Sequence, residues 1–261
     1  MIRSRKRAAQ VRQAGTTGST ERQVGLARAL SKLGHCSRSQ ASLLIQAGKV
    51  KLNGRVRRDP ETPVHISSDK IEIGDLLVRE EEFVYLMLNK PRGLVTTASD
   101  EKGRETVYAL LGKDFPWVAP VGRLDKASEG LLLLTNDSEW AARILDPASA
   151  VEKTYHVQID STVPESIVAA LLNGVQCDGE PLRIRRASVL RQGKRNAWLE
   201  ILLDEGKNRH IRRMLAALDV KVLRLVRVSI GPLALGTLGK GATRQMGLAE
   251  KNAIDSLLQD L

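Results

Sequence analysis

The chain has 261 residues, of which 42% are hydrophobic, and it carries a formal net charge of +11. This length allows one large domain or two smaller ones, and the hydrophobic content is enough for a sizeable core. The sequence has neither the roughly 20 consecutive apolar residues of a membrane span nor an apolar signal segment after Met1, so we expect no membrane partner.

The positive charge is concentrated toward the N-terminus. Residues 1–22 carry a net charge of +5, residues 23–80 carry +4, and residues 81–261 carry only +2. This skew indicates an acidic partner, most simply nucleic acid. We expect residues 1–22 to be a disordered basic tail that binds RNA, although an Arg-rich, acid-poor segment also fits an organelle transit peptide.

The two cysteines, Cys36 and Cys177, lie far apart in the sequence and have no metal-ligand spacing. We therefore expect no metal site and interpret both as small buried side chains in a reducing compartment. This composition predicts a cytoplasmic protein.

Residues 23–80 are predicted to fold as a small unit that begins with two helices. Apolar residues with helical spacing mark the first helix, at Leu26, Ala29, Leu30 and Leu33. Gly34 is suited to end this helix. Ser37 can cap the second helix, which is predicted to stop at Gly48.

A hairpin should follow at Asn53-Gly54, because this dipeptide is the strongest short hairpin signal. A strand over residues 70–73 then closes the unit. The segment from Gln23 to about Asp75 resembles the small RNA-binding domain of ribosomal protein S-four. By this resemblance, four basic residues should contact the RNA backbone: Arg38, Lys49, Lys51 and Arg55. A solvated basic surface is the alternative interpretation.

Residues 81–261 are predicted to form a larger domain after an acidic linker at residues 80–82. Strands are expected at residues 83–97 (with a turn at Pro91 and Gly93), 154–159, 181–190, 197–203 and 220–229. Helices are expected at residues 105–111, 138–145, 164–172 and 208–218. Strands outnumber helices and do not alternate strictly with them, which favours an α+β fold with a mixed, largely antiparallel sheet.

One acidic residue, Asp125, occurs in the string GRLDKASEGLLLLTND, residues 122–137. It follows Arg123 and precedes a turn, after which four leucines predict a buried strand. A strand end is a common place to mount a reactive group. Asp is also frequent in ordinary turns, where it bonds its own backbone.

The string LLDEGKNRHIRRML, residues 202–215, predicts an amphipathic helix with Asn208 as a reasonable cap. Its first turns hold the cations Lys207, Arg209, Arg212 and Arg213. Cations at a helix N-terminus oppose the helix dipole, so an anionic group is expected nearby. A solvated basic helix face is the alternative. A third string, VEKTYHVQI at residues 151–159, places Tyr155 on a strand, where a core position is the ordinary interpretation.

Together with LNKPRGLVTT at residues 88–97, these strings resemble in order and spacing the RsuA/RluB/RluF group of ribosomal RNA pseudouridine synthases, with RluB-like proteins the nearest. The resemblance covers residues 23–245. His210 is a departure, because this group more often has Gln there. The four histidines are scattered, and we interpret them as structural or RNA-facing. We expect the core to hold all three tryptophans, Trp117, Trp140 and Trp198.

The resemblance implies the isomerisation of uridine to pseudouridine, a redox-neutral reaction that needs no cofactor. By resemblance, Asp125 is the nucleophilic or charge-stabilising carboxylate, and Arg212 is its basic partner with Ile211 packed beside it. Tyr155 stacks on the uracil and helps remove a carbon-bound proton. Arg123 fills the space left by the flipped base. Lys207, Asn208 and Arg209 are further expected RNA contacts.

We therefore expect residues 81–261 to be a catalytic domain acting, as a monomer, on ribosomal RNA or a pre-ribosomal particle. Large-subunit RNA is the first candidate substrate. The alternatives are the same reaction on small-subunit RNA or transfer RNA, and a catalytically silent RNA-binding or ribosome-assembly protein on the same fold.

Overall fold

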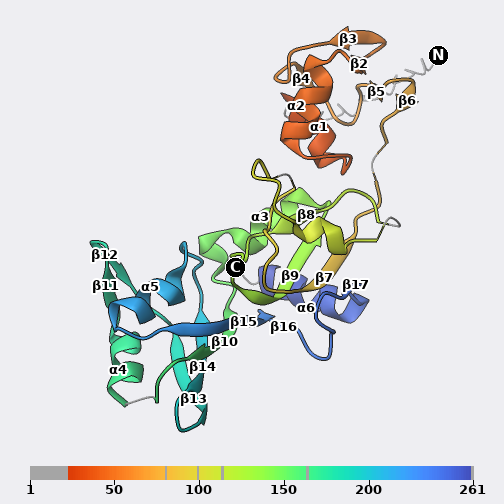
Figure 1. The fold of residues 1–261 in the computed structure, drawn as a ribbon. Helices are drawn as coiled ribbons and strands as arrows, with labels where there is room; N and C mark the ends of the chain where they lie inside the picture. The colour runs from red at the N-terminus through yellow and green to blue at the C-terminus, as the bar shows by residue number, and fades with distance from the viewer. Residues whose placement is uncertain (1–22, 80, 99, 113–114, 163–164, 260–261) are drawn as a thin grey trace, which may run out of the picture.

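The structure is a computed structural model that describes residues 23–79, 81–98, 100–112, 115–162 and 165–259. The predicted basic tail, residues 1–22, lies outside the described residues. Figure 1 shows an N-terminal unit, residues 23–79, and a larger C-terminal unit, residues 81–259. Within the described part of the chain, every helix is too short or too polar to cross a lipid bilayer.

The N-terminal unit packs two helices, α1 (Leu26–Lys32) and α2 (Arg38–Gln46), against short strands around one apolar core. Its strands are β1 (Val24–Gly25), β2 (Val50–Leu52), β3 (Arg55–Arg57), β4 (Pro63–Val64), β5 (Ile71–Ile73) and β6 (Leu76–Leu77). β1 pairs with β4, and the other four form a sheet in the order β3-β2-β5-β6. The two predicted helices and the strand over residues 70–73 are confirmed.

Local sequence signals explain these boundaries. The Ser37 hydroxyl accepts from the backbone N–H of Gln40, and the Gln40 side chain accepts from the backbone N–H of Ser37, so α2 begins with a capping box. Asn53 and Gly54 have φ values of 52° and 76°, the positive pair that a two-residue hairpin turn requires. The predicted hairpin is therefore confirmed as β2–β3.

The C-terminal unit is built on one nine-stranded sheet. Its strands are β7 (Tyr85–Lys90), β8 (Ala119–Val121), β9 (Glu129–Thr135), β10 (Lys153–Ile159), β13 (Arg186–Gln192), β14 (Ala197–Leu203), β15 (Val222–Ile230), β16 (Leu233–Ala234) and β17 (Thr243–Gln245). The main order is β13-β14-β10-β15-β9-β7-β17, and every pair is antiparallel except β9–β15. This arrangement confirms the α+β class with a mixed, largely antiparallel sheet.

The four leucines of β9 are fully buried because both faces of the strand are covered. Leu131 and Leu133 pack with α3 and α6, whereas Leu132 and Leu134 pack on the other side with Val107 and its neighbours. Burial of each side chain contributes about 2 kcal/mol. The continuous apolar run therefore indicates a central strand, as the sequence predicted.

Helices flank the sheet: α3 (Ser138–Leu145), α4 (Glu165–Asn173), α5 (His210–Ala217) and α6 (Leu248–Gln259), with 3-10 turns at Val107–Leu110 and Pro147–Ser149. α4 and α5 lie on the same side of β10, β13 and β14 (Figure 1). A two-stranded ribbon, β11 (Val175–Cys177) and β12 (Glu180–Leu182), packs beside α5. Cys36 and Cys177 are both free and buried, as expected.

Several sequence predictions were wrong. The helix over residues 105–111 is only a four-residue 3-10 turn. The strand over residues 181–190 is two strands, β12 and β13, separated by residues 183–185, of which Ile184 is buried. Trp117 and Trp198 are not fully buried, and Trp198 is partly exposed on the sheet surface, whereas Trp140 is buried as predicted.

Candidate active site

A cleft of about 660 Å³ opens where the two halves of the sheet meet, at the β9–β15 junction. Its walls come from the loop before β9, the end of α3, β10, β15 and the segment that leads into α5. The predicted site residues that line it are Arg123, Asp125, Tyr155, Lys207, Asn208, Arg209 and Ile211. Residues from three separate strings of the sequence are therefore brought together in one cavity.

Asp125 lies in a tight loop between β8 and β9. The backbone N–H of Ser128 donates to the carbonyl of Asp125 at 2.9 Å, which closes the turn. The Thr96 hydroxyl donates to the carbonyl of Leu124 at 2.8 Å and ties the loop to the segment after β7. The Asp125 side chain is half-buried, while Arg123 on the same loop is exposed. The loop is thus fixed by its backbone, and the carboxylate faces the cleft.

Lys90, at the end of β7, was not predicted to take part in this site. It is fully buried, and its ammonium group donates to three carbonyls, those of Pro91 (3.1 Å), Asp125 (3.1 Å) and Ser128 (2.9 Å). Burial lowers the pKa of Lys90 to about 8, although the charges of Asp125 and Glu129 oppose this shift. The available signal was a lysine at the end of a strand whose residues 86–88 are apolar.

Gly130 allows the junction to close. Its φ is +103°, and a Cβ atom there would lie 2.7 Å from the backbone nitrogen of Arg227 and closer still to its oxygen. Only glycine permits β9 and β15 to approach this closely.

Tyr155 and Lys153 project from β10 into the cleft, two residues apart on the same face of the strand. Arg227 of β15, directly opposite Tyr155, also lines the cleft. Its guanidinium is buried and donates through Nε to the carbonyl of Leu131 at 2.7 Å. Burial, together with the nearby charge of Arg227, lowers the pKa of Lys153. Lys153 and Arg227 therefore add two cations that the sequence interpretation had missed.

The segment before α5 forms the opposite rim. Lys207, Asn208 and Arg209 are all exposed there, and Lys207 pairs with Glu180 and Glu205 at 3.3 Å. The prediction that Asn208 caps the helix was wrong: Arg209 is the cap residue, with a left-handed φ of 50° and no side-chain cap bond. His210 is buried in the cleft wall, and burial lowers its pKa.

Arg212 lies behind the Asp125 loop rather than in the cleft wall. It is partly buried, and its Nη2 donates to the carbonyl of Ala127 at 3.1 Å. Burial and the charge of Arg209 lower the pKa of Arg212, and the charge of Asp125 opposes that shift. Arg212 therefore interacts with Asp125 electrostatically and supports the same loop.

The N-terminal candidates lie outside this cleft. Arg38, Lys49 and Arg55 are exposed on the N-terminal unit, and Lys51 pairs with Asp75 at 3.1 Å. Within the described residues, no three side chains of His, Cys, Asp or Glu are grouped in a way that would hold a metal ion.

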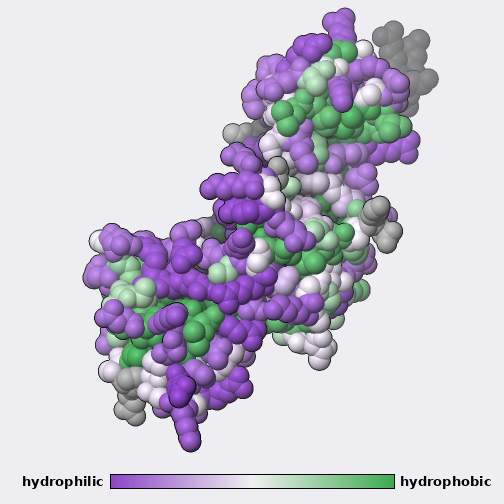
Figure 2. Space-filling view, viewed as in Figure 1, coloured by the Kyte–Doolittle hydropathy of each residue, from purple (hydrophilic) through white to green (hydrophobic). Residues whose placement is uncertain are grey.

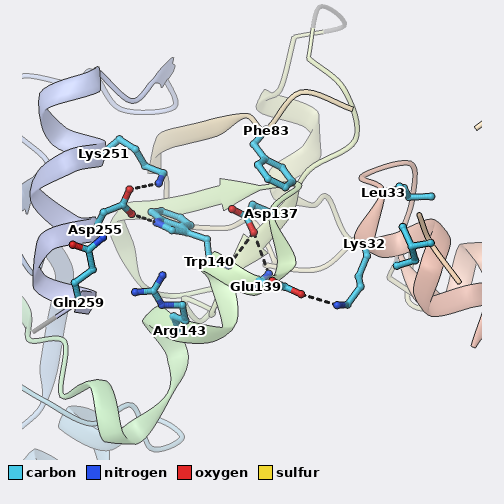
Figure 3. A pocket seen from close by; sticks show the side chains of 11 residues that line it. Lys32, Leu33, Phe83, Asp137, Glu139, Trp140, Arg143, Lys251, Asp255 and Gln259 are labelled. Atoms are coloured by element: carbon cyan, nitrogen blue, oxygen red, sulfur yellow. Dashed lines mark hydrogen bonds and ion pairs between the residues drawn. The ribbon is translucent and has the colours of Figure 1, made fainter. Parts of the chain in front are cut away.

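A second cavity, of about 420 Å³, lies where α1 approaches α3 (Figure 3). Its polar groups are satisfied by one another: Lys32 pairs with Glu139 at 2.6 Å, and the Trp140 indole N–H donates to Asp255 at 2.8 Å. Lys251 pairs with Asp255 as well. These groups leave no unpaired reactive side chain, so we place the candidate active site in the larger cleft.

Comparison with known proteins decides the family. A family model described as RNA pseudouridylate synthase matches residues 84–217, and an S4 domain model matches residues 24–71. The chain belongs to the RNA pseudouridylate synthase family. It is therefore an isomerase that converts uridine in RNA to pseudouridine, as the sequence resemblance implied. The S4 match likewise confirms the resemblance of the N-terminal unit.

Relatives of the enzyme are similar over most of their length. The ribosomal large subunit pseudouridine synthase B of Bacillus subtilis (strain 168) is 35% identical over 85% of this chain and 91% of its own. An RNA pseudouridine synthase of Aquifex aeolicus (strain VF5) is 36% identical over 87% of this chain and 92% of its own. The crystal structure of a pseudouridylate synthase superposes with a TM-score of 0.62 and 32% identity, covering 88% of this chain and 99% of that one.

Proposed function

We propose that the enzyme converts one specific uridine of large-subunit ribosomal RNA to pseudouridine. The observation that carries this proposal is the convergence of Asp125, Tyr155 and the Arg209–Ile211 segment in one cleft. The name of the Bacillus subtilis relative supports ribosomal RNA of the large subunit as the substrate. The net charge of +11 supports a large polyanionic partner.

Asp125 is the proposed nucleophile or charge-stabilising carboxylate. The loop that carries it is held by Lys90 and Arg212 through backbone carbonyls, so the carboxylate is left free for the substrate. The reaction breaks the bond between uracil and ribose, and the base then rejoins the sugar through carbon. Carbon 5 of the uracil loses a proton in this exchange, and N1, which is freed from the ribose, gains one. A group fixed before the substrate arrives needs little reorganisation during this step.

Tyr155 is proposed to stack on the uracil and to assist removal of that proton, because it projects from β10 into the same cleft. The target base must leave its stack first, at a cost of roughly a few kcal/mol. We propose that the exposed Arg123 fills the vacated position. Lys207, Asn208 and Arg209 lie on the rim, where they would contact the adjoining backbone.

We also propose that residues 23–80 form the RNA-binding domain and residues 81–261 the catalytic domain. Arg38, Lys49, Lys51 and Arg55 would contact RNA from the first of these. A monomer that acts in the cytoplasm stays a prediction, which sedimentation velocity and fractionation would test.

The deciding experiment is tritium release from ribosomal RNA labelled at carbon 5 of uridine. We expect release by the wild type and none by Asp125→Asn, with RNA affinity retained in the variant. Separate assays on large-subunit RNA, small-subunit RNA and transfer RNA distinguish the substrates. Failure of the wild type to release tritium from all three, and from immature particles, would favour a silent RNA-binding protein.

A further inference from the structure

The half of the sheet formed by β10, β13, β14 and β15 has one covered and one uncovered face. On the cleft side, core residues from β10 and β14 are at most 2% exposed, namely Val157, Leu199, Ile201 and Leu203. On the opposite side, the alternate residues are all partly or fully exposed, namely His156, Gln158, Trp198, Glu200 and Arg224. We call this second side the rear face.

Trp198 lies at the middle of a row of side chains across the rear face. In the strand register Arg191 is opposite Trp198, Trp198 is opposite Gln158, and Gln158 is opposite Arg224. This row crosses four strands, which is about 14 Å at the usual strand spacing. The guanidinium carbons of Arg191 and Arg224 lie 5.1 Å and 5.6 Å from the indole centroid.

Both guanidinium carbons lie within the roughly 6 Å at which a cation interacts with an aromatic ring, and this contact restrains the two side chains. A guanidinium held by its flat face keeps its N–H edge available, and that edge matches the oxygens of a phosphate. Arg224 already uses part of this edge on Glu129, at 3.1 Å. Arg191 forms no ion pair among the described residues and is exposed. The row therefore presents an ordered cation without an anionic partner.

The turn between β13 and β14 adds further positive charge beside this row. Lys194 and Arg195 occupy this turn, are exposed, and form no ion pair within the described part of the chain. The turn lies at the far end of the C-terminal unit in Figure 1, and Figure 2 shows a hydrophilic projection at that end.

The charge balance of the rear face differs from that of its surroundings. Six Lys and Arg side chains belong to it or reach it, namely Arg186, Arg191, Lys194, Arg195, Arg224 and Lys240, and among the described residues they form ion pairs with only two carboxylates, Glu129 and Glu200. Residues 81–261 as a whole carry a net charge of only +2. The excess is thus a local concentration of charge.

We propose that the rear face, with the β13–β14 turn, is a second RNA-binding surface. It binds the phosphate backbone of the substrate RNA at a position outside the cleft. An RNA backbone fits because three exposed cations of this surface, Arg191, Lys194 and Arg195, have no anionic partner among the described residues. The proposal rests on RNA being the substrate. Since this face is opposite the one that carries Tyr155, it would bind a distant segment of the same molecule.

The test compares the full-length wild type with Lys194→Gln/Arg195→Gln, using a large-subunit ribosomal RNA transcript in filter binding across a salt series. Loss of two phosphate contacts should weaken RNA binding about tenfold at 0.1 M salt. The slope of the logarithm of the binding constant against the logarithm of the salt concentration should become shallower by about 1.4. Lys102→Gln/Arg143→Gln, which removes two exposed charges of the C-terminal unit outside the rear face, is the matched control. The kcat for tritium release should not change, while KM should rise.

A second comparison isolates the stacked row. Trp198→Leu should weaken RNA binding severalfold in the wild-type chain but have little further effect in Arg191→Gln, because the indole acts through the guanidinium. Ultraviolet cross-linking should join RNA to peptides from residues 186–200. Equal affinities and salt slopes for the test and control doubles would overturn the proposal, as would cross-links from this face to ribosomal proteins alone. Tritium release by the wild type is scored separately, so failure of the proposed function remains distinguishable.

Discussion

The Lys90 ammonium group lies 3.1 Å from the main-chain carbonyl of Asp125, inside a fully buried environment. The lysine therefore fixes the backbone of the proposed nucleophile, and its own hydrogen bonds do not involve the Asp125 carboxylate. Because Lys90 ends β7 and Asp125 precedes β9, this one contact ties the loop to the central strand pair.

Replacing Lys90 with Met should loosen the Asp125 loop. Three carbonyls would lose their donor, and a destabilisation of about 3 kcal/mol is expected from unsatisfied buried groups. The kcat for tritium release should fall at least about tenfold, since small displacements of reacting groups are costly. Lys126→Met, an exposed lysine on the same loop, is the control. If Lys90→Met were stable and fully active, Lys90 would not be needed to position the Asp125 loop.

The stability of the enzyme should depend on pH through Lys90. The pKa of this group is about 8 in the folded chain, below the ordinary value of 10.5. Between these values the unfolded chain binds more protons, so the folded state gains stability as the pH rises from 8 to 10.5 and loses it as the pH falls back. The free energy of unfolding, measured in urea for the wild type and for Lys90→Met, should differ between the two by an amount that rises over this pH range. If this difference in the free energy of unfolding did not change between pH 8 and 10.5, a lowered pKa for Lys90 would be contradicted.

Gly130→Ala should separate the two halves of the sheet. Its Cβ would collide with the backbone of Arg227, and its φ is positive, so we expect a loss of at least about 3 kcal/mol and of activity. Gly54→Ala shares a positive φ but meets no atom within 4 Å, so about 1 kcal/mol is expected there. Thermal unfolding measures both. Similar losses in the two variants would mean that backbone conformation, not the close approach, is responsible.

Tyr155 can be tested for separate stacking and proton-transfer roles. Tyr155→Phe keeps the ring, so the affinity for RNA should persist while kcat falls roughly a hundredfold if the hydroxyl moves a proton. Tyr155→Leu should lower both the affinity for RNA and kcat. Single-turnover tritium release, with binding measured in the Asp125→Asn background, distinguishes the two effects. An unchanged kcat in Tyr155→Phe would restrict the residue to stacking.

Elements set by short local signals were predictable from the sequence. Helix α3 was predicted with its observed bounds, because Asp137 caps it and its apolar face is well spaced. The β2–β3 hairpin and the capped start of α2 depend on two or three adjacent residues each. Strand β9 was also predictable, since a strand covered on both faces needs a continuous apolar run.

The missed features depend on partners distant in sequence. β17 pairs with β7 although the paired residues are more than 150 positions apart, and no local pattern indicates this. The sequence alone indicates a solvated strand end at Lys90, because two of the three carbonyls that surround its ammonium group belong to Asp125 and Ser128, more than 30 residues away. The sequence alone indicates a core position for Trp198, and only the fold shows that its face of the sheet is uncovered. In the site, the motif strings predicted which residues meet, but not that Arg212 would support the loop from behind.

The single parallel pairing, β9 with β15, also bears on how the chain folds. The paired residues Glu129 and Val226 are about 100 positions apart, so this contact closes a long loop and should form late. Until synthesis has passed Ile230, the edge of β9 that will receive β15 stays open, and open apolar strand edges promote misassembly. The cleft therefore cannot exist on a partly made chain, and the Asp125 loop acquires its far wall only when the last strand of the junction arrives.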